Sequence, residues 1–370
     1  MKKKILFLFP LPPPIHGVSV INKSILDNKK IKKTFITSFL NSSSNKNYKH
    51  LNKFTIAKLL IFIKICFNLV KKLKQFKPNM VYVNLSPRGI GFYKDIFLIF
   101  IIKIFKVKII NHLHGKGIKK EIEKNFFIKK IYTNTFKNLD LICLSKLLTK
   151  DIQQVSDKSC SIQIVNNFGL KAHKLHLKSN KKKITFIFLS NLLPAKGILI
   201  FLDAIKIIQK KYNRYDFDAK IIGKSSCKES ESKIEKKILD LKNITFLGPQ
   251  FGDKKYEELL SSSVLVFPTR HPNEAFPIVL LEAMASKLGI ITSDEGGIPD
   301  IVTNNAEGII LKKCSPFNCA KAMLKYLNNK NLAMKHGDSG YKKYQKYFTP
   351  KIFEQNMIKA LKKVIINNNL

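Results

Sequence analysis

The chain has 370 residues, of which 45% are apolar, so it is long enough for about two globular domains and is neither fibrous nor intrinsically disordered. With 67 Lys and Arg against 25 Asp and Glu, the formal net charge of +42 favours anionic partners such as nucleotides, nucleic acids or acidic membranes. Since only three of the basic residues are arginines, the charge is equally compatible with compositional drift on solvated faces, because recognition of bases or phosphates favours bidentate Arg.

The first half alternates short β-branched runs with longer helical patterns, which is typical of a parallel α/β sheet. The expected strands are residues 4–9, 80–84, 108–112, 141–144 and 163–165. The expected helices are residues 18–27, 54–76, 92–106, 118–137 and 146–154. The basic start of the chain resembles a signal peptide, but its apolar run has only five residues before Pro10, so we interpret it as the first buried strand.

The polar, Lys-rich segment 171–183 breaks this alternation and is interpreted as a linker. A second series of strands follows at 184–189, 219–222, 244–246, 264–267, 289–292 and 308–311. The helices between and after them are expected at 197–212, 229–241, 253–261, 277–286, 298–303 and 316–328. The chain is thus expected to form two doubly wound Rossmann-like domains, 1–170 and 184–345, facing a central cleft where ligands bind, with a C-terminal helix in 346–370 that packs back on the first domain.

Two apolar segments are candidates for membrane spans. Residues 55–70 and 92–105 are both interrupted by lysines, and neither reaches the roughly 18 uninterrupted apolar residues that a span needs. Together with the basic, aromatic segment 119–130 they form either a face suited to anionic lipid or ordinary core helices with lysine-coated outer faces.

The six cysteines form no CxxC pair and have no His partner at zinc-ligand spacing, which favours a reducing compartment and free thiols. Asp216-Phe217-Asp218 has the form of a DxD metal motif, but it precedes an expected strand and is interpreted as a turn. No metal site is therefore expected.

The most informative segment is Pro268–Ser286, which contains two glutamates eight residues apart. Glu274 is expected in the loop after strand 264–267, and Glu282 in the second turn of a helix that Pro277 begins. The unpaired amides at a helix N-terminus form an anion site, and carboxylates beside it can accept hydrogen bonds from sugar hydroxyls. Without further context, an equally good interpretation is that Glu274 is an ordinary loop residue and Glu282 an exposed residue on the helix surface, neither with a role in binding.

This segment resembles the E-x7-E element of family 4 retaining glycosyltransferases with the GT-B fold, of the type that builds bacterial surface polysaccharides. Other pieces resemble the same family in the same order. In the second half they are Phe188–Leu192 with Lys196-Gly197, Ile221–Gly223, Phe246–Gly248 and Gly296–Asp300. In the first half the likeness is looser, at Pro12–Gly17, His112–Gly115, Leu144-Ser145 and Val165–Asn167.

The resemblance implies a role for each matching residue. Glu282 would bind the ribose hydroxyls of a sugar nucleotide, Glu274 would contact hydroxyls of the transferred sugar, and Lys196 would hold the diphosphate and stabilise the leaving group. The remaining donor-site residues that the resemblance assigns are Gly223, Asn191 and the backbone amides of Ala275, Phe276 and Ile278.

The match has two departures. Asn191 stands where the family commonly has Arg, so a second cationic phosphate ligand is missing, and Pro277 replaces a frequent Gly and removes one backbone donor. Arg270 either compensates for the missing cation or pairs with Glu274.

In the first half, Gly17 allows close backbone approach to a phosphate or to the acceptor. His16 beside it is either an acceptor ligand or an ordinary loop residue. His114 resembles the histidine that faces the cleft in the family and would be catalytic, whereas His112 is expected to point into the sheet.

The predicted function is retaining transfer of a sugar from a UDP- or GDP-sugar to a hydroxyl of a glycan or lipid-linked acceptor, without a metal or other cofactor. The predicted location is the cytoplasm, with attachment to the inner face of the membrane as an extension, and no specific nucleic-acid partner is expected. The alternatives are a sugar-nucleotide epimerase or hydrolase of the same fold, and a non-catalytic basic module that binds nucleic acid or membrane.

Overall fold

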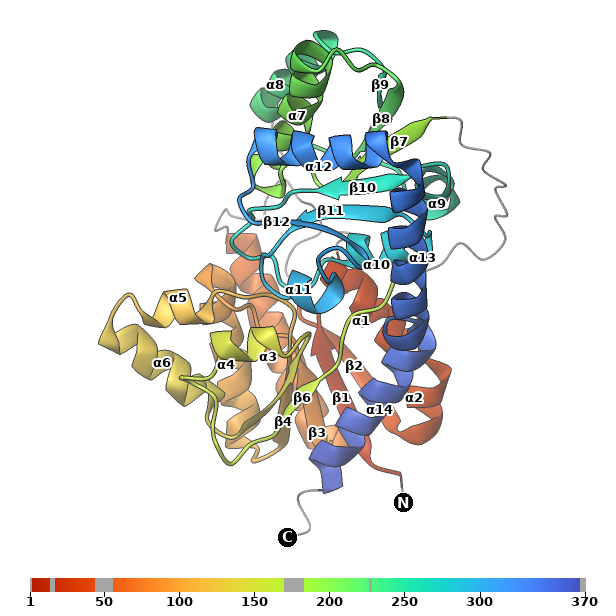
Figure 1. The fold of residues 1–370 in the computed structure, drawn as a ribbon. Coiled ribbons are helices and arrows are strands. Elements are labelled where there is room, and N and C mark those ends of the chain that lie inside the picture. The colour runs from red at the N-terminus through yellow and green to blue at the C-terminus, as the bar shows by residue number, and fades with distance from the viewer. Residues whose placement is uncertain (1, 14–16, 44–55, 170–182, 226–227, 367–370) are drawn as a thin grey trace. The chain divides into compact units, whose positions relative to one another are not determined.

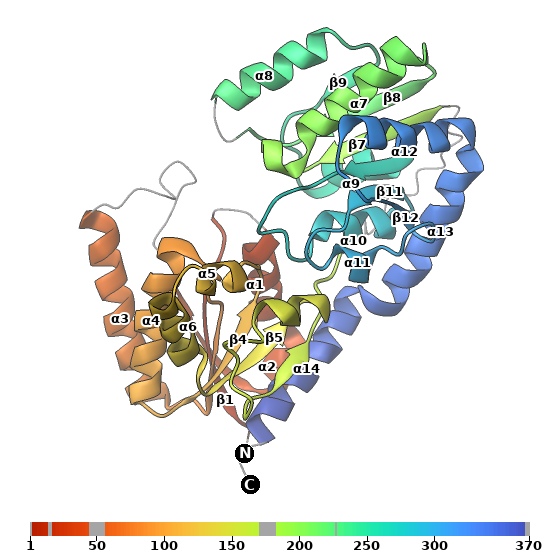
Figure 2. The same ribbon diagram turned by 60° about the vertical axis from the view of Figure 1, so that its left-hand side comes forward.

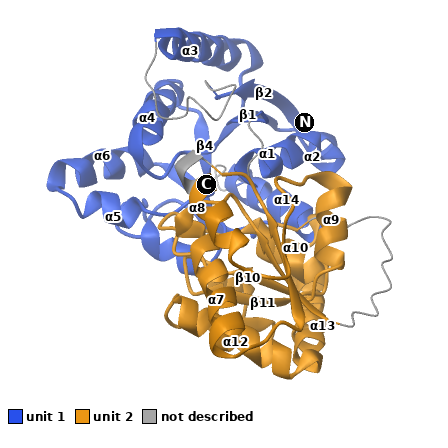
Figure 3. Cartoon of the chain, turned by 90° about the horizontal axis from the view of Figure 1, so that it is seen from above, with its two compact units in different colours: residues 1–167, 351–370 blue, residues 168–350 orange. Residues whose placement is uncertain are grey.

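A computed structural model describes residues 2–13, 17–43, 56–169, 183–225 and 228–366, and it divides into two compact units. Unit 1 comprises residues 1–167 and 351–370, and unit 2 comprises residues 168–350 (Figure 3). The expected linker at 171–183 lies almost wholly outside the described residues, as does His16.

Unit 1 is built on a parallel sheet of six described strands in the order β2-β1-β3-β4-β5-β6 (Figure 1). Its strands are β1 (Lys4–Phe9), β2 (Ile36–Asn41), β3 (Met80–Val83), β4 (Lys108–Leu113), β5 (Leu139–Cys143) and β6 (Ile162–Ile164). The strands β1, β3 and β5 are buried along almost their whole length, as expected of parallel strands covered by helices on both faces.

The helices of unit 1 form its outer layers. They are α1 (Gly17–Asp27), α2 (Lys29–Thr34), α3 (Ile56–Phe76), α4 (Gly89–Ile104), α5 (Ile118–Ile122), α6 (Phe126–Phe136) and α14 (Pro350–Ile366), with a 3₁₀ turn η2 (Leu147–Asp151). The last helix, α14, belongs to unit 1 although unit 2 separates it from the rest in sequence. Its Glu354 forms an ion pair with Lys30 and accepts a hydrogen bond from Asn28.

Unit 2 is built on a second parallel sheet of six described strands, in the order β12-β11-β10-β7-β8-β9 (Figure 1). Its strands are β7 (Ile184–Leu189), β8 (Phe217–Ile222), β9 (Ile244–Phe246), β10 (Val264–Phe267), β11 (Gly289–Ser293) and β12 (Gly308–Leu311). The chain runs outward from β7 to β9 and then returns to β10 on the other side of β7. The β7/β10 boundary is therefore the topological switch point, where ligands of doubly wound sheets bind.

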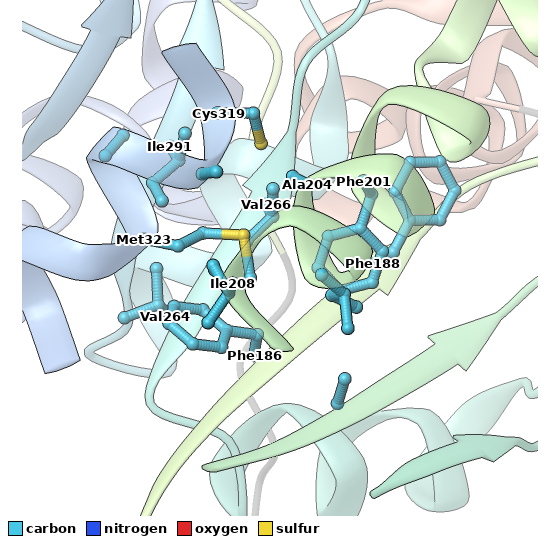
Figure 4. Packing of buried hydrophobic residues seen from close by; sticks show 14 of the residues in the cluster. Phe186, Phe188, Phe201, Ala204, Ile208, Val264, Val266, Ile291, Cys319 and Met323 are labelled. Atoms are coloured by element: carbon cyan, nitrogen blue, oxygen red, sulfur yellow. The ribbon is translucent and has the colours of Figure 1, made fainter. Parts of the chain in front are cut away.

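Helices cover this second sheet. They are α7 (Ile198–Lys211), α8 (Lys228–Leu239), α9 (Gly252–Leu260), α10 (Ile278–Ala285), α11 (Ile298–Ile301), α12 (Pro316–Asn328) and α13 (Lys330–Tyr347), with a 3₁₀ turn η3 (Pro194–Lys196). Helices α7 and α12 pack against each other and enclose the main core of unit 2, where Phe186, Phe188 and Met323 are fully buried (Figure 4). Helix α10 packs against α13.

The structure differs from the sequence-based expectation in a few elements. Strand β2 and helices α2 and α13 were not expected, and the helix expected at 118–137 is two helices. The first ends at Ile122, and Asn125 caps the second, because its Oδ1 accepts a hydrogen bond from the Ile128 amide at 2.9 Å. The residues expected to form a helix at 146–154 make only the 3₁₀ turn η2, and Asp218 lies in β8 rather than in a turn. In the described part of the chain, none of the helices combines the length and the hydrophobicity that a membrane span requires.

Candidate functional site

Two predicted site residues meet at the switch point of unit 2. Lys196 ends η3 just after β7, and Glu274 lies in the loop after β10, so each follows one of the two strands that flank the boundary. The Lys196 Nζ lies 2.6 Å from the Glu274 Oε2. Residues 78 positions apart are thus joined by an ion pair at the place where the sheet topology favours ligand binding.

This ion pair is largely enclosed by protein. Glu274 is buried, and its Oε2 also accepts a hydrogen bond of 3.1 Å from the hydroxyl of Thr269. The Lys196 ammonium lies 5.7 Å from the centre of the Phe267 ring, within range of a cation–π contact. The site therefore presents a cation for an anionic group directly beside a carboxylate that can accept hydrogen bonds from hydroxyls.

Backbone contacts hold the two loops together. The Arg270 amide donates to the Ala195 carbonyl at 2.8 Å, which ties the loop after β10 to the turn that carries Lys196. Gly296 has φ +58, and a Cβ at this position would lie 2.0 Å from the Glu274 carbonyl oxygen. Only glycine fits there, so the loop after β11 can pack directly on the backbone of Glu274.

The second glutamate has a different set of partners. Glu282 lies in α10, and its Oε1 is 2.6 Å from the Lys255 Nζ and accepts a hydrogen bond of 3.1 Å from the Tyr256 hydroxyl. Both partners come from α9. Burial and the adjacent carboxylate raise the pKa of the Tyr256 hydroxyl, so Tyr256 remains a hydrogen-bond donor to Glu282.

The remaining predicted donor-site residues of unit 2 lie around these two glutamates. Ala275 and Phe276 are buried directly after Glu274, and Ile278 is the first residue of α10, where a helix leaves its amides without intrahelical acceptors. Asn191 is exposed just after β7. Gly223 follows β8 with φ +157, and a Cβ there would lie 1.9 Å from the Ser190 carbonyl oxygen, so packing alone requires a glycine.

The two predicted site residues of unit 1 lie at the carboxyl ends of its strands. Gly17 is exposed and begins α1, the helix after β1, and β1 forms one side of the β1/β3 switch point of that sheet. His114 follows β4 and is half-buried, with its ring centre 3.9 Å from that of His112.

His112 lies fully buried in β4, as expected, and shares a hydrogen bond of 2.5 Å with the Tyr82 hydroxyl through its Nδ1. Burial, and to a lesser extent the nearby His114, holds the pKa of His112 well below its usual value. Nearby, the Asn84 side-chain amide donates to the His112 carbonyl. The His112 Nε2 and the Asn84 Oδ1 are buried and have no hydrogen-bond partner among the described residues, which marks this strand end as a place for a polar ligand or water.

Sequence reasoning missed three contacts. Thr269 lies within the segment Pro268–Ser286, five residues before Glu274, so its place in the sequence could have indicated a contact with Glu274. Lys255 and Tyr256 have no such signal, because they lie in a helix without a motif and Lys255 is one of many lysines. Arg270 is exposed, and the ion pair of Glu274 found in the described part of the chain is with Lys196 instead.

The described residues contain no group of three or more His, Cys, Asp or Glu side chains placed to hold a metal ion. Asp216 of the DxD-like segment forms a two-point contact with Arg214, in which Arg214 Nε and one terminal nitrogen each donate to a different carboxylate oxygen. This contact gives Asp216 a structural role.

Comparison with known proteins finds a family match in the second half of the chain. Residues 171–343 match the family model described as glycosyl transferases group 1. The chain is 30% identical over 247 residues to an uncharacterized glycosyltransferase of Methanocaldococcus jannaschii, in a match covering 64% of this chain and 63% of the relative. It is 22% identical over 257 residues to the amylovoran biosynthesis glycosyltransferase AmsK of Erwinia amylovora, covering 64% and 61%. The chain thus spans just under two thirds of the length of these two relatives.

Solved structures resemble the whole chain. HepE of Anabaena in complex with UDP superposes with a TM-score of 0.77 at 15% identity, covering 97% of this chain and all of HepE. A glycosyltransferase of Rickettsia africae superposes with a TM-score of 0.76 at 17% identity, covering 99% and 100%. Both matches confirm the expected GT-B fold of two parallel six-stranded sheets with helices. The chain therefore has the GT-B fold, and its residues 171–343 match the glycosyl transferases group 1 family.

Proposed function

We propose that this chain is a family 4 retaining glycosyltransferase that moves a sugar from a nucleotide-sugar donor to a hydroxyl of a glycan or lipid-linked acceptor in bacterial surface-polysaccharide synthesis. The observation that carries the proposal is the Lys196–Glu274 ion pair at the β7/β10 switch point of the glycosyl transferases group 1 domain. A matched pair of cation and carboxylate suits a ligand that has a diphosphate next to a sugar.

In this proposal the two charges bind the two halves of the donor. Lys196 binds the diphosphate and stabilises the negative charge that develops on the leaving nucleotide. Glu274 accepts hydrogen bonds from hydroxyls of the transferred sugar. The amides of Ala275, Phe276 and Ile278 add neutral donors to the diphosphate at the start of α10, where the helix dipole favours an anion.

Glu282 is proposed to bind the ribose. Lys255 and Tyr256 hold one of its oxygens from α9 and thereby orient the carboxylate before the donor arrives. We favour a uridine nucleotide over a guanosine nucleotide, since the fold neighbour HepE has been solved with UDP and with UDP-glucose.

Retention of the anomeric configuration is proposed from the resemblance of the E-x7-E segment. The acceptor hydroxyl would attack from the face that the nucleotide leaves, and the leaving phosphate would accept its proton. The enzyme then contributes alignment and electrostatic stabilisation, so no metal ion is needed and EDTA should leave the rate unchanged.

The acceptor is proposed to bind at the strand ends of unit 1, where Gly17 and His114 lie. The buried polar atoms of His112 and Asn84 that have no partner among the described residues support a polar ligand there. Surface-polysaccharide synthesis is supported by AmsK and by the capsular polysaccharide biosynthesis glycosyltransferase CapM of Staphylococcus aureus, which is 24% identical over 263 residues. The corresponding location is the cytoplasm, at the inner face of the membrane.

The test is nucleotide release from UDP-, GDP-, dTDP- and CMP-sugars, with and without lipid-linked glycan, and with NMR of the product anomer. We expect that the enzyme releases the nucleotide from one donor only when the acceptor is present, and that the product retains the anomeric configuration of the donor. Lys196→Ala should lower kcat/KM by roughly 10²- to 10³-fold, the usual cost of losing one group that stabilises the transition state. Glu282→Gln should weaken donor binding.

The matched control is Lys343→Ala. Lys343 and Glu307 form an ion pair in the same unit with side-chain exposures of 19% and 9%, close to the 18% and 7% of Lys196 and Glu274. This control should retain activity. Release without acceptor, giving a free or epimerised sugar, would replace the transferase with a hydrolase or epimerase. Absence of binding to every donor would favour a non-catalytic basic module.

A further inference from the structure

Unit 1 carries two helices whose outward faces are apolar instead of polar. On α3 the exposed residues Ile56, Leu60, Ile63 and Phe67 follow spacings of four, three and four residues, which is one face of a helix. On α4 the exposed residues Ile90, Tyr93, Phe97, Phe100 and Ile104 follow the same periodicity. In both helices the buried residues form a second stripe that packs into the unit, so each helix is apolar on two faces.

These two exposed stripes lie on neighbouring helices, and a third helix extends them. The rings of Phe62 on α3 and Phe97 on α4 meet edge to face, with centres 6.3 Å apart. Phe92 of α4 stacks on Tyr132 of α6 at 3.8 Å, which fixes α6 beside α4 (Figure 2). Helix α6 begins with the exposed Phe126 and Phe127. We call the exposed residues of α3, α4 and α6 together the apolar face.

The summed apolar area that the residues of this face expose is large. Its five phenylalanines are 62% to 76% exposed, and at about 200 Å² for each side chain they alone leave about 700 Å² of ring surface in solvent. The largest apolar patch of a typical monomer measures about 300–600 Å², and larger ones mark interaction sites. The exposed aliphatic residues add to this area, so the face needs a partner.

The charge around the apolar face selects that partner. Residues 56–136 contain 17 Lys or Arg but only three Asp or Glu, and one of these acids, Asp95, is buried. The exposed lysines among them are Lys64, Lys71, Lys74, Lys77, Lys106, Lys119, Lys120, Lys124, Lys129 and Lys130. A second copy of the chain would bring this positive charge against itself, which opposes self-association. Nucleic acid would neutralise the lysines but would leave the aliphatic side chains without a partner.

A bilayer with acidic headgroups satisfies both features. Phenylalanine, isoleucine and leucine side chains enter the boundary between headgroups and acyl chains, while lysines beside them reach back to the phosphates. We infer that the apolar face of α3, α4 and α6 is a docking surface that lies flat on an anionic lipid bilayer. The inference deepens the proposed location at the inner face of the membrane and rests on that part of the proposed function, since it names the surface that docks there. No residue of the donor site takes part in it.

Sedimentation with vesicles tests this docking surface in the full chain. Vesicles of phosphatidylcholine with 30% phosphatidylglycerol are compared with vesicles of phosphatidylcholine alone, at low and at physiological salt. The anionic vesicles should bind the protein at least tenfold more tightly than the neutral ones, since each lysine near the surface changes the partition coefficient by roughly fivefold. Binding should weaken with salt but persist, because the apolar contribution is not screened.

Two pairs of variants separate the apolar and the charged contributions. Phe67→Ala/Phe97→Ala/Phe100→Ala should lower binding at least tenfold, whereas Leu239→Ala/Phe251→Ala, which removes exposed apolar side chains of unit 2, should not. Lys129→Gln/Lys130→Gln should lower binding to anionic vesicles but not to neutral ones. The matched control is Lys210→Gln/Lys236→Gln, which removes two exposed lysines of unit 2 and should leave vesicle binding unchanged.

The inference is overturned if wild type fails to bind anionic vesicles at low salt, or if the triple Phe variant binds as wild type does. It is also overturned if sedimentation equilibrium shows a lipid-free dimer that the triple variant dissociates, because the face would then bind a second copy. UDP binding by calorimetry without lipid should be unchanged in the triple variant. A loss of vesicle binding is thereby distinguished from a failure of the donor site.

Discussion

The Lys255–Glu282 ion pair offers a quantitative test of how the second glutamate is held. Lys255→Met keeps the aliphatic length of the side chain but removes the cation that lies 2.6 Å from Glu282. The Glu282 side chain is only 8% exposed and would retain the Tyr256 hydroxyl as its partner. Removing one partner of a buried pair costs about 3–5 kcal/mol, and because Lys255 is partly exposed we expect the lower end, about 3 kcal/mol.

The second variant of the cycle removes the buried charge. Lys255→Met/Glu282→Gln replaces the carboxylate with a neutral amide that still accepts from Tyr256, so it should recover about 2 kcal/mol of the loss. For a unit of 183 residues, 3 kcal/mol corresponds to a fall in Tm of roughly 6–12 °C. The assay is thermal and urea unfolding followed by circular dichroism, since the chain has no Trp.

An exposed lysine provides the control for this cycle. Lys236→Met changes the same side chain on the surface of the same unit and should alter the unfolding free energy by less than about 0.5 kcal/mol. The reasoning fails if Lys255→Met lies within 1 kcal/mol of wild type, or if adding Glu282→Gln lowers stability further instead of restoring it.

Three further predictions concern the backbone, a buried histidine and a helix cap. Gly296→Ala should cost about 2–3 kcal/mol and lower donor turnover, because its Cβ meets the Glu274 carbonyl; Gly248→Ala, with φ +66 and open space around it, should cost only about 1 kcal/mol in the same urea titration. Folding lowers the pKa of His112, so keeping this histidine neutral stabilises the folded state above the unfolded pKa of about 6.5, and this stabilisation is lost as the pH falls below that value. Between pH 7.5 and 5.5 the unfolding free energy of wild type should therefore fall by about 1.4 kcal/mol more than that of His112→Gln. Equal pH dependence of the two unfolding free energies would contradict this. Asn125→Ala removes the α6 cap and should cost about 1 kcal/mol, whereas Asn125→Asp should restore it.

The sequence predicted the strands of the two sheets well because their apolar runs have no competing interpretation. Strands such as Ile184–Leu189 are buried along their whole length and are bounded by polar residues, so hydrophobicity marks both ends. Strand β2 was missed for the opposite reason. It lies at the edge of its sheet and its residues are exposed or half-buried, so its pattern is that of a loop. Helix α13 was missed because it is polar and contains Gly337 and Gly340, which lower helix propensity.

The candidate site could be found only in part. The spacing of Glu274 and Glu282 and the position of Lys196 before Gly197 are visible in the chain, but their partners are not. Sequence reasoning left Arg270, four residues from Glu274, either as a substitute for the missing cation or as a partner of Glu274. The structure pairs Glu274 with a lysine 78 residues away. That contact depends on the strand order, in which β10 returns to the side of β7, and periodicity along the chain contains no information on strand order.

The discontinuity of unit 1 has a consequence for the order in which the protein forms during synthesis. Six buried side chains of α14 belong to unit 1, yet they leave the ribosome only after all of unit 2. Unit 2 is continuous from residue 168 to residue 350 and has every strand of its sheet before the last helix is made. Domains of a growing chain usually complete from the N-terminus. Here the second unit completes first, and unit 1 must wait, with part of its core uncovered, until α14 has been translated.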